Sequence, residues 1–239
     1  MIGLGTIINT AAILVGGLLG GIFGRFLHDS AQDTLNKVCG VSTLFIAVTG
    51  VLEKMLRVEN GAIVSSGAML MIGCLAIGAI IGEWLNIEGA FERFGQWLKI
   101  KSGNAKDKGF VNAFVTASLT VCIGAMAIVG SIQDGIVGDY SILATKAVLD
   151  LIIIMVMSCS MGKGAVFSAI SVAAFQGSIT LLAGLLRPLM TDAALHNLSL
   201  VGNVLIFCVG INLVWGKKIK VANLLPAIVI AVIAAFLPI

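Results

Sequence analysis

Apolar residues run through this chain in long stretches that are separated by short polar connections. Most stretches are about 20 residues long, which is the length that an α-helix needs to cross the hydrocarbon core of a bilayer. We therefore predict an all-α, polytopic integral membrane protein with about eight transmembrane helices, in which residues 1–239 form a single transmembrane domain. The predicted spans are about 2–24, 38–53, 61–82, 110–132, 142–161, 164–186, 197–216 and 221–239.

The composition supports a membrane protein. Hydrophobic residues make up 59% of the chain and charged residues 11%, with a mean hydropathy of +1.09. Soluble domains carry about 25% charged residues, so a soluble fold could not cover this much apolar surface. The net charge is only +3, and the basic residues gather in the connections between spans. That distribution reports membrane topology rather than nucleic-acid binding, so we expect no nucleic-acid partner.

The positive-inside rule assigns an orientation. Of the 15 lysines and arginines, 11 lie in the odd-numbered connections, and the connection between the third and fourth spans is the richest. We therefore place the odd-numbered connections in the cytoplasm and both termini outside. Residues 83–109 are expected to form an amphipathic helix in the cytoplasmic headgroup region, followed by a linker.

Glycines form a ridge along the first span. Gly16, Gly20 and Gly24 recur at intervals of four, a pattern that lets helix backbones approach closely within one chain or between the subunits of a homo-oligomer. The segment Gly20–Phe26 also aligns with Gly78–Trp84 at an offset of 58 residues. This similarity predicts an internal two-helix repeat, although GxxxG patterns also recur by chance in glycine-rich membrane helices.

Two pairs of polar residues interrupt the apolar runs. Lys146 and Asp150 lie one helical turn apart in the fifth span, and Asp150 is the deepest carboxylate in the apolar sequence. A charged residue inside a span is costly, which makes this pair a candidate binding site, or else an ion pair that locks two helices together. Gln133 and Asp134 follow glycines and a serine, which predicts either an interrupted helix with a binding site or a helix that ends at the outer interface with Asp134 solvated.

Amide side chains add to these candidates. Asn9, Gln176 and Asn203 fall inside predicted spans and could join Asp150 in one cavity, or could serve as interhelical hydrogen-bonding groups. The candidate substrate- or ion-binding residues are therefore Asp150, Lys146, Asp134, Gln133, Gln176, Asn9 and Asn203. No resident cofactor or metal is expected, and a coupling Na⁺ or H⁺ would act through Asp150.

Several of these motifs resemble one family. The run Cys122–Gly135 resembles the FCIGAMAI-x-GSI-x-DG signature of the bacterial YqgA/YdfK-type membrane proteins, called domain of unknown function 554. Val121 stands where that family usually has phenylalanine. The resemblance covers essentially the whole chain and implies a multi-pass protein of the bacterial cell membrane, in a family described no further than as candidate transport proteins. Further segments that carry the resemblance are Lys146–Asp150, Gln176–Ser178, Gly210–Leu213 and Val221–Pro226.

Three functions fit this pattern. The first is a secondary transporter of a small polar solute or ion, and the second is a membrane scaffold or sensor subunit whose polar residues only pack. The third is an ion channel, which would need a continuous polar stripe. The sequence contains no HExxH, GxSxG or phosphate-binding motif, and we expect no enzymatic activity. The expected partners are the lipid bilayer and a small solute or ion.

Overall fold

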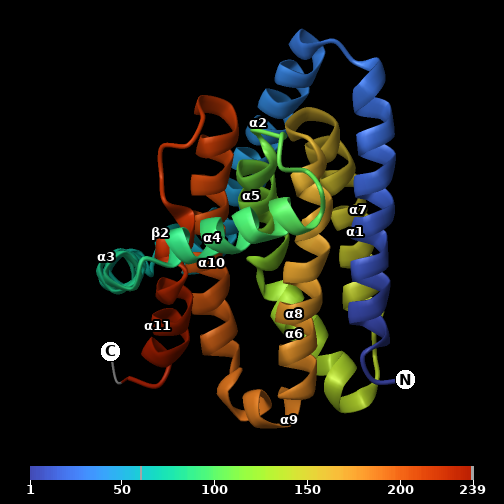
Figure 1. Ribbon diagram of the computed structural model, residues 1–239. Coiled ribbons are helices and arrows are strands. Elements are labelled where there is room, and N and C mark those ends of the chain that lie inside the picture. The colour runs from blue at the N-terminus through green and yellow to red at the C-terminus, as the bar shows by residue number, and fades with distance from the viewer. Residues whose placement is uncertain (60, 238–239) are drawn as a thin grey trace.

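The computed structural model describes residues 1–59 and 61–237, except for the side chain of residue 29 (Figure 1). Apart from a two-stranded hairpin, its regular structure is helical. The α-helices are α1 (Leu4–Phe23), α2 (Asp29–Met55), α3 (Ala68–Leu85), α4 (Ile87–Lys101), α5 (Phe110–Cys122), α6 (Ala125–Val137), α7 (Ser141–Met161), α8 (Ser168–Leu181), α9 (Ala183–Leu186), α10 (Asp192–Trp215) and α11 (Pro226–Ala234). The strands are β1 (Leu56–Glu59) and β2 (Ala62–Ser65), and the 3₁₀ turns are η1 (Gly24–Phe26), η2 (Lys163–Phe167), η3 (Arg187–Leu189) and η4 (Val221–Leu224).

The all-α polytopic prediction is confirmed, with a lower count of full-length spans. Within residues 1–59 and 61–237, six helical segments are long and apolar enough to cross a membrane, and the bent pair α5–α6 makes a seventh if it counts as one. The predicted eighth span is shorter, a helical segment at Val221–Ala234. Proline begins its α-helix at Pro226, after a 3₁₀ turn, and the last two residues of the prediction lie outside the described residues.

The boundaries of the second and third spans were predicted wrongly. The second helix, α2, has 27 residues and is much longer than the predicted 38–53. The predicted start of the third span instead forms strand β2, which pairs antiparallel with β1 so that Leu56 lies opposite Ser65. A short apolar run with β-branched residues suits a strand as well as a helix, and Gly67, at φ 82, then starts α3.

The fourth predicted span is a broken helix. α5 ends at Cys122, Ile123 is extended, and the axis turns by 63° before α6 begins at Ala125. Gly124 has φ 152, a conformation that side-chain-bearing residues rarely adopt, so glycine allows the break. The break lies at the first of the glycines that the sequence indicated before Gln133, and α6 continues through Gln133 and Asp134 to Val137.

The glycine ridge packs within the chain. α1 runs beside α7 (Figure 1). A Cβ atom at Gly16, Gly20 or Gly24 would come closer than 3.0 Å to a main-chain carbonyl oxygen of α7. Those oxygens belong to Leu151, Met155 and Cys159, which share the four-residue spacing of the glycines. The ridge therefore sets the register between α1 and α7.

The second glycine pattern has a similar environment. Gly78 and Gly82, which align with Gly20 and Gly24, pack against backbone atoms of Ala227 and Asn223. Each glycine pair thus lets its helix approach a helical segment from later in the chain. The two-helix repeat stays a prediction, and this shared packing supports it.

The residues after α3 form the predicted amphipathic helix. α4 follows α3 directly at Asn86, whose left-handed conformation (φ 49) separates the two helices. α3 is seen nearly end-on in Figure 1, so α3 and α4 both run across the direction of the long helices. α4 packs on α5, and α3 packs on α11. The location of α4 in the headgroup region stays a prediction.

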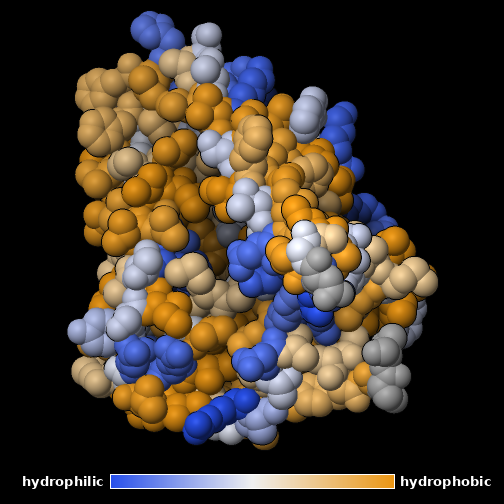
Figure 2. All heavy atoms as spheres, turned by 180° about the vertical axis from the view of Figure 1, so that it is seen from behind, coloured by the Kyte–Doolittle hydropathy of each residue, from blue (hydrophilic) through white to orange (hydrophobic). Residues whose placement is uncertain are grey.

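Apolar side chains cover much of the outer surface. The most hydrophobic 18-residue windows of α2 and α3 are only 17% buried, against 44% for α7 and α10. Figure 2 shows hydrophobic residues spread over most of one face of the molecule, with hydrophilic residues gathered in smaller groups. A surface of this kind is compatible with lipid and not with water, so the bilayer is the environment of these helices.

The connections gather at two ends. In Figure 1 the α1–α2 and α7–η2 connections lie at one end, and the α6–α7 connection and α9 lie at the other. Residues 107–109 approach Met161 and Gly162, which places the α4–α5 linker with the first group. The first, third and fifth connections therefore share an end.

This arrangement makes the predicted orientation testable. In a background without the five native cysteines, Asn104→Cys should resist labelling by a membrane-impermeant thiol reagent in intact cells, because its connection faces the cytoplasm. The matched variant Asp139→Cys, in the exposed α6–α7 connection, should be labelled. The reverse pattern would invert the orientation.

Candidate functional site

Four polar side chains from three helices meet inside the protein. We call them the Asp150 cluster: Asn9 on α1, Lys146 and Asp150 on α7, and Gln176 on α8. Asn9 and Gln176 are 0% exposed, Asp150 3% and Lys146 7%. Asp150 is the tenth of the 21 residues of α7, so the cluster lies near the middle of that span. The sequence proposed all four residues, and the structure brings them together.

Lys146 connects the cluster to the break in α5–α6. Its ammonium forms an ion pair with Asp150, one turn along α7, and donates a hydrogen bond of 2.8 Å to the main-chain oxygen of Val121. Val121 is in the last turn of α5, where carbonyl groups have no partner within the helix and carry the negative end of the helix dipole. The break thus supplies an acceptor that a continuous helix would have used itself.

The amides complete the cluster and leave polar atoms free. Asn9 Nδ2 donates to Asp150 Oδ2 at 2.9 Å and to Gln176 Oε1 at 3.3 Å. Asn9 Oδ1 and Gln176 Nε2 are buried and have no hydrogen-bond partner in the described part of the chain. An unpaired buried polar group costs about 1–3 kcal/mol. Two of them beside a charged pair indicate a place where a polar ligand or ion would be stabilised.

Asp134 has a different position from the one expected. The carboxylate is neither solvated nor part of the Asp150 cluster: it is 0% exposed, more deeply buried than Asp150. Its two oxygens accept hydrogen bonds from the backbone amides of Gly3 at 3.2 Å and Gly5 at 3.0 Å, at the start of α1. A carboxylate there satisfies orphan N–H groups and complements the helix dipole. The structure therefore assigns Asp134 to holding α1 against α6.

Two further candidates do not join the cluster. Asn203 on α10 donates to the main-chain oxygen of Ser199 at 2.8 Å, and its side chain packs against Gly50 of α2. Gln133 is partly exposed on α6 and forms none of the hydrogen bonds that hold the cluster together. The hydrogen bonds of Asn203 therefore stay within α10, and its side chain contacts α2 by packing alone.

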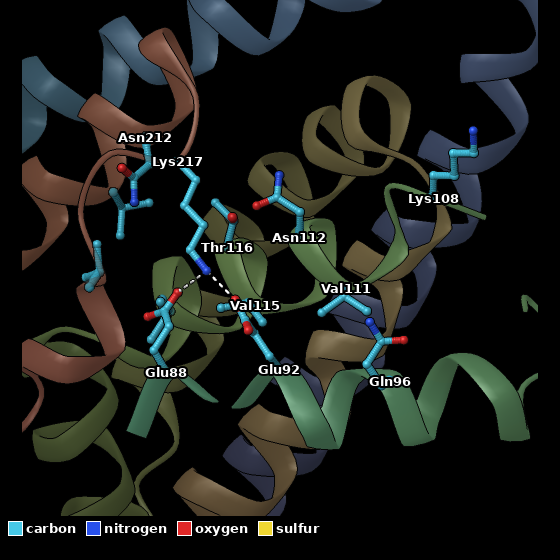
Figure 3. Close-up of a pocket in the computed structure, with 13 residues that line it drawn as sticks. Glu88, Glu92, Gln96, Lys108, Val111, Asn112, Val115, Thr116, Asn212 and Lys217 are labelled. Carbon is cyan, nitrogen blue, oxygen red and sulfur yellow. Dashed lines mark hydrogen bonds and ion pairs between the residues drawn. The ribbon is translucent and has the colours of Figure 1, made fainter. Parts of the chain in front are cut away.

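A second polar region lies at the surface between α4, α5, α10 and the connection before η4 (Figure 3). This cleft has a volume of about 300 Å³, at the small end of the range for ligand sites. On α5 it extends to Leu119, about one helical turn before the break. Its lining residues are Glu88, Glu92, Gln96, Lys108, Val111, Asn112, Val115, Thr116, Leu119, Val209, Asn212, Lys217 and Val221.

Lys217 bridges two carboxylates at the edge of the cleft. Figure 3 shows its ammonium between Glu88 and Glu92 of α4, and the distance to Glu88 Oε1 is 2.8 Å. Glu88 is only 5% exposed, and its other oxygen accepts a hydrogen bond of 3.0 Å from Ala222 N. Partial burial opposes the charge of Lys217, but the two carboxylates outweigh it and raise the pKa of the ammonium. This connection therefore clamps α4 to the segment that precedes α11.

The family comparison agrees with the helical and polar pattern. A family model described as "Protein of unknown function (DUF554)" matches residues 4–236. The chain belongs to this family. "Uncharacterized membrane protein YdfK" of Bacillus subtilis (strain 168) is 30% identical over 232 residues, covering 97% of this chain and 95% of its own. "Uncharacterized protein YqgA" of Escherichia coli (strain K12) is 25% identical over 232 residues, covering 95% and 94%. No solved structure matches.

The DUF554 assignment and the similarity to YdfK make this chain a multi-pass membrane protein with bacterial relatives.

Two residues escaped the sequence analysis. Glu88 lies in the predicted amphipathic helix and Asn223 in the Val221–Pro226 motif, but neither was proposed as a site residue. Asn223 Oδ1 accepts a hydrogen bond of 2.7 Å from Glu88 N. The available signal was the Val221–Pro226 motif, whose amide lies inside an otherwise apolar run.

Proposed function

We propose that this protein is a secondary transporter of a small polar solute or ion, with no enzymatic activity. The observation that carries the proposal is the buried Lys146–Asp150 pair at the break of the discontinuous helix α5–α6. Transporters place substrate and ion sites near the middle of the membrane, where interrupted helices leave main-chain groups free to bind them. The Val121 carbonyl is such a group, and the Lys146 ammonium contacts it directly.

Two further features support a pathway to this site. The cleft between α4, α5 and α10 is polar at its mouth, and its apolar inner wall ends about one turn before the break. The exposed Asn112 and the partly exposed Thr116 line it on one face of α5. The lining residue Leu119 is two positions before Val121, whose carbonyl contacts Lys146, so α5 connects the cleft to the Asp150 cluster.

A scaffold or sensor role is the alternative that the Asp150 cluster itself keeps open, because buried ion pairs also serve only to fix helix contacts. The two functions differ in whether the cluster binds anything. A transporter must bind its solute, whereas a purely structural cluster gains nothing from added small molecules.

A ligand screen tests the proposal. The detergent-purified protein is heated with a panel of amino acids, carboxylates, sugars and inorganic salts, and any stabilising compound is then supplied in labelled form to proteoliposomes. At 100 times its dissociation constant a ligand stabilises the fold by about 2.7 kcal/mol. We expect at least one compound to raise the melting temperature and to accumulate in the proteoliposomes.

The matched control is a charge-removing substitution elsewhere. Asp139→Asn changes the same side chain in an exposed connection and should leave both signals intact, whereas loss of the Asp150 charge should remove them. Failure of the whole panel to accumulate above protein-free liposomes would favour the scaffold role.

A further inference from the structure

Lys146 occupies an environment that is built from oxygen atoms. Its ammonium contacts the Asp150 carboxylate and the Val121 carbonyl oxygen, which lies at the C-terminal end of a half-helix. Asn9 donates to the same carboxylate oxygen and has a buried amide oxygen without a partner in the described residues. Carboxylate, carbonyl and amide oxygens are the ligands that hard cations take in proteins.

The charges decide what kind of cation would fit. Asp150 supplies one negative charge, and the end of the α5 dipole adds a fraction of another. The Lys146 ammonium, a single positive charge, balances this site as it stands. A monovalent ion would do the same, whereas a divalent ion would leave a net positive charge in an apolar interior, which is costly.

The unpartnered amide oxygen points to a second state. In the present arrangement Asn9 directs its NH₂ group at Asp150, which suits a carboxylate whose charge Lys146 balances. Turning the Asn9 amide over would bring Oδ1 toward Asp150. That arrangement is favourable only if a cation lies between the two oxygens. Gln176, fully buried beside Asn9, has a second amide that can turn in the same way.

We propose that the end of α5, Asp150 and Asn9 form a binding site for a monovalent cation, and that the Lys146 ammonium fills this site as a tethered cation in the present conformation. Within the proposed transporter, on which this inference builds, the coupling cation would replace the Lys146 ammonium. Movement of Lys146 away from Asp150 would then accompany ion entry and reorganise the break between α5 and α6.

Removing the tethered cation tests the site. Lys146→Ala deletes the ammonium and leaves room for an ion. With the alkali cation at about ten times its dissociation constant, the melting temperature of this variant should be about 3 °C or more higher in NaCl, KCl or LiCl than in choline chloride of equal ionic strength. Lys146→Met removes the same charge but fills the space, so it should show no such difference. Lys146→Ala/Asp150→Asn should also show none.

Each outcome is decisive. Equal melting of Lys146→Ala in all the salts would overturn the site, and so would stronger stabilisation by CaCl₂ than by any monovalent salt. If Lys146→Ala aggregates in choline chloride, at least one alkali salt should restore a monodisperse protein. Aggregation of the variant in every salt would contradict the cation site. Because transport is not measured, a negative result here leaves the transporter proposal standing, and a positive one survives a failed transport assay.

Discussion

Asp150→Asn should lower the free energy of unfolding by about 3–5 kcal/mol, because it removes one partner of a buried ion pair. The Lys146 and Asp150 side chains are only 8% and 5% exposed, so water can replace little of the lost interaction. Denaturation of the detergent-purified protein followed by circular dichroism would measure the change. The exposed Asp139→Asn keeps the Oδ1 acceptor that Ser141 uses at the start of α7, so it should stay within about 0.5 kcal/mol of the unchanged protein.

A second substitution separates stability from function. Lys146→Met in the Asp150→Asn background leaves no uncompensated charge, so the double variant should return to within about 2 kcal/mol of the original stability. We expect any ligand-induced stabilisation and transport to stay absent, because the charge that binds the solute or ion is gone. A rescued double variant that still transports would exclude Asp150 as a binding residue, and a missing rescue would mean that the pair is not the source of the instability.

Gly20→Leu should have a comparably large effect by a different mechanism. A side chain at Gly20 would overlap the main-chain oxygen of Met155, so α1 and α7 would have to separate along their most extensive contact. Overpacking a close interface costs about 1–3 kcal/mol, and a clash with backbone belongs at the upper end, because a carbonyl cannot change rotamer. Lower yield and a lower melting temperature are the expected readouts.

The neighbouring glycine provides a matched control. A Cβ atom at Gly21 would meet nothing within 4 Å, so Gly21→Leu adds the same side chain to the same helix without a clash. Its stability should stay near that of the original protein, helped by the better helix propensity of leucine. An equal loss of stability in Gly20→Leu and Gly21→Leu would show that the glycine ridge does not determine the packing of α1 on α7.

The features that the sequence predicted well are local ones. The spans follow from long apolar runs, and the Lys146–Asp150 pair follows from their spacing of four on one helix. The glycine ridge could be predicted because its residues also repeat at intervals of four on one helix. The helix that packs against it, α7, could not be predicted from that spacing. Which amides join Asp150 depends on tertiary packing, since Asn9 reaches it across 141 residues of sequence. The sequence could therefore propose Asn9, Gln176 and Asn203 alike, and only the fold separates Asn203 from the other two.

The errors also have physical causes. Gln133-Asp134-Gly135 reads as a polar turn, because nothing nearby could satisfy a buried carboxylate; its partners are the amides of Gly3 and Gly5. Ile63 and Val64 are apolar and β-branched, which suits both a span and the strand that they form. Glu88 was not proposed as a site residue, because its partners come from the segment after α10 and only the fold brings them to it.

The bond between Asp134 and the start of α1 constrains how the protein is made. Gly3 is synthesised 131 residues before Asp134, whose carboxylate accepts a hydrogen bond from the Gly3 amide. At ordinary synthesis rates this separation is a delay of roughly 7–26 s. The surface of α1 that will receive α7 is equally without a partner during that time. The glycine face of α1 therefore has no α7 to pack against until the residues of α7, up to Met161, have been synthesised.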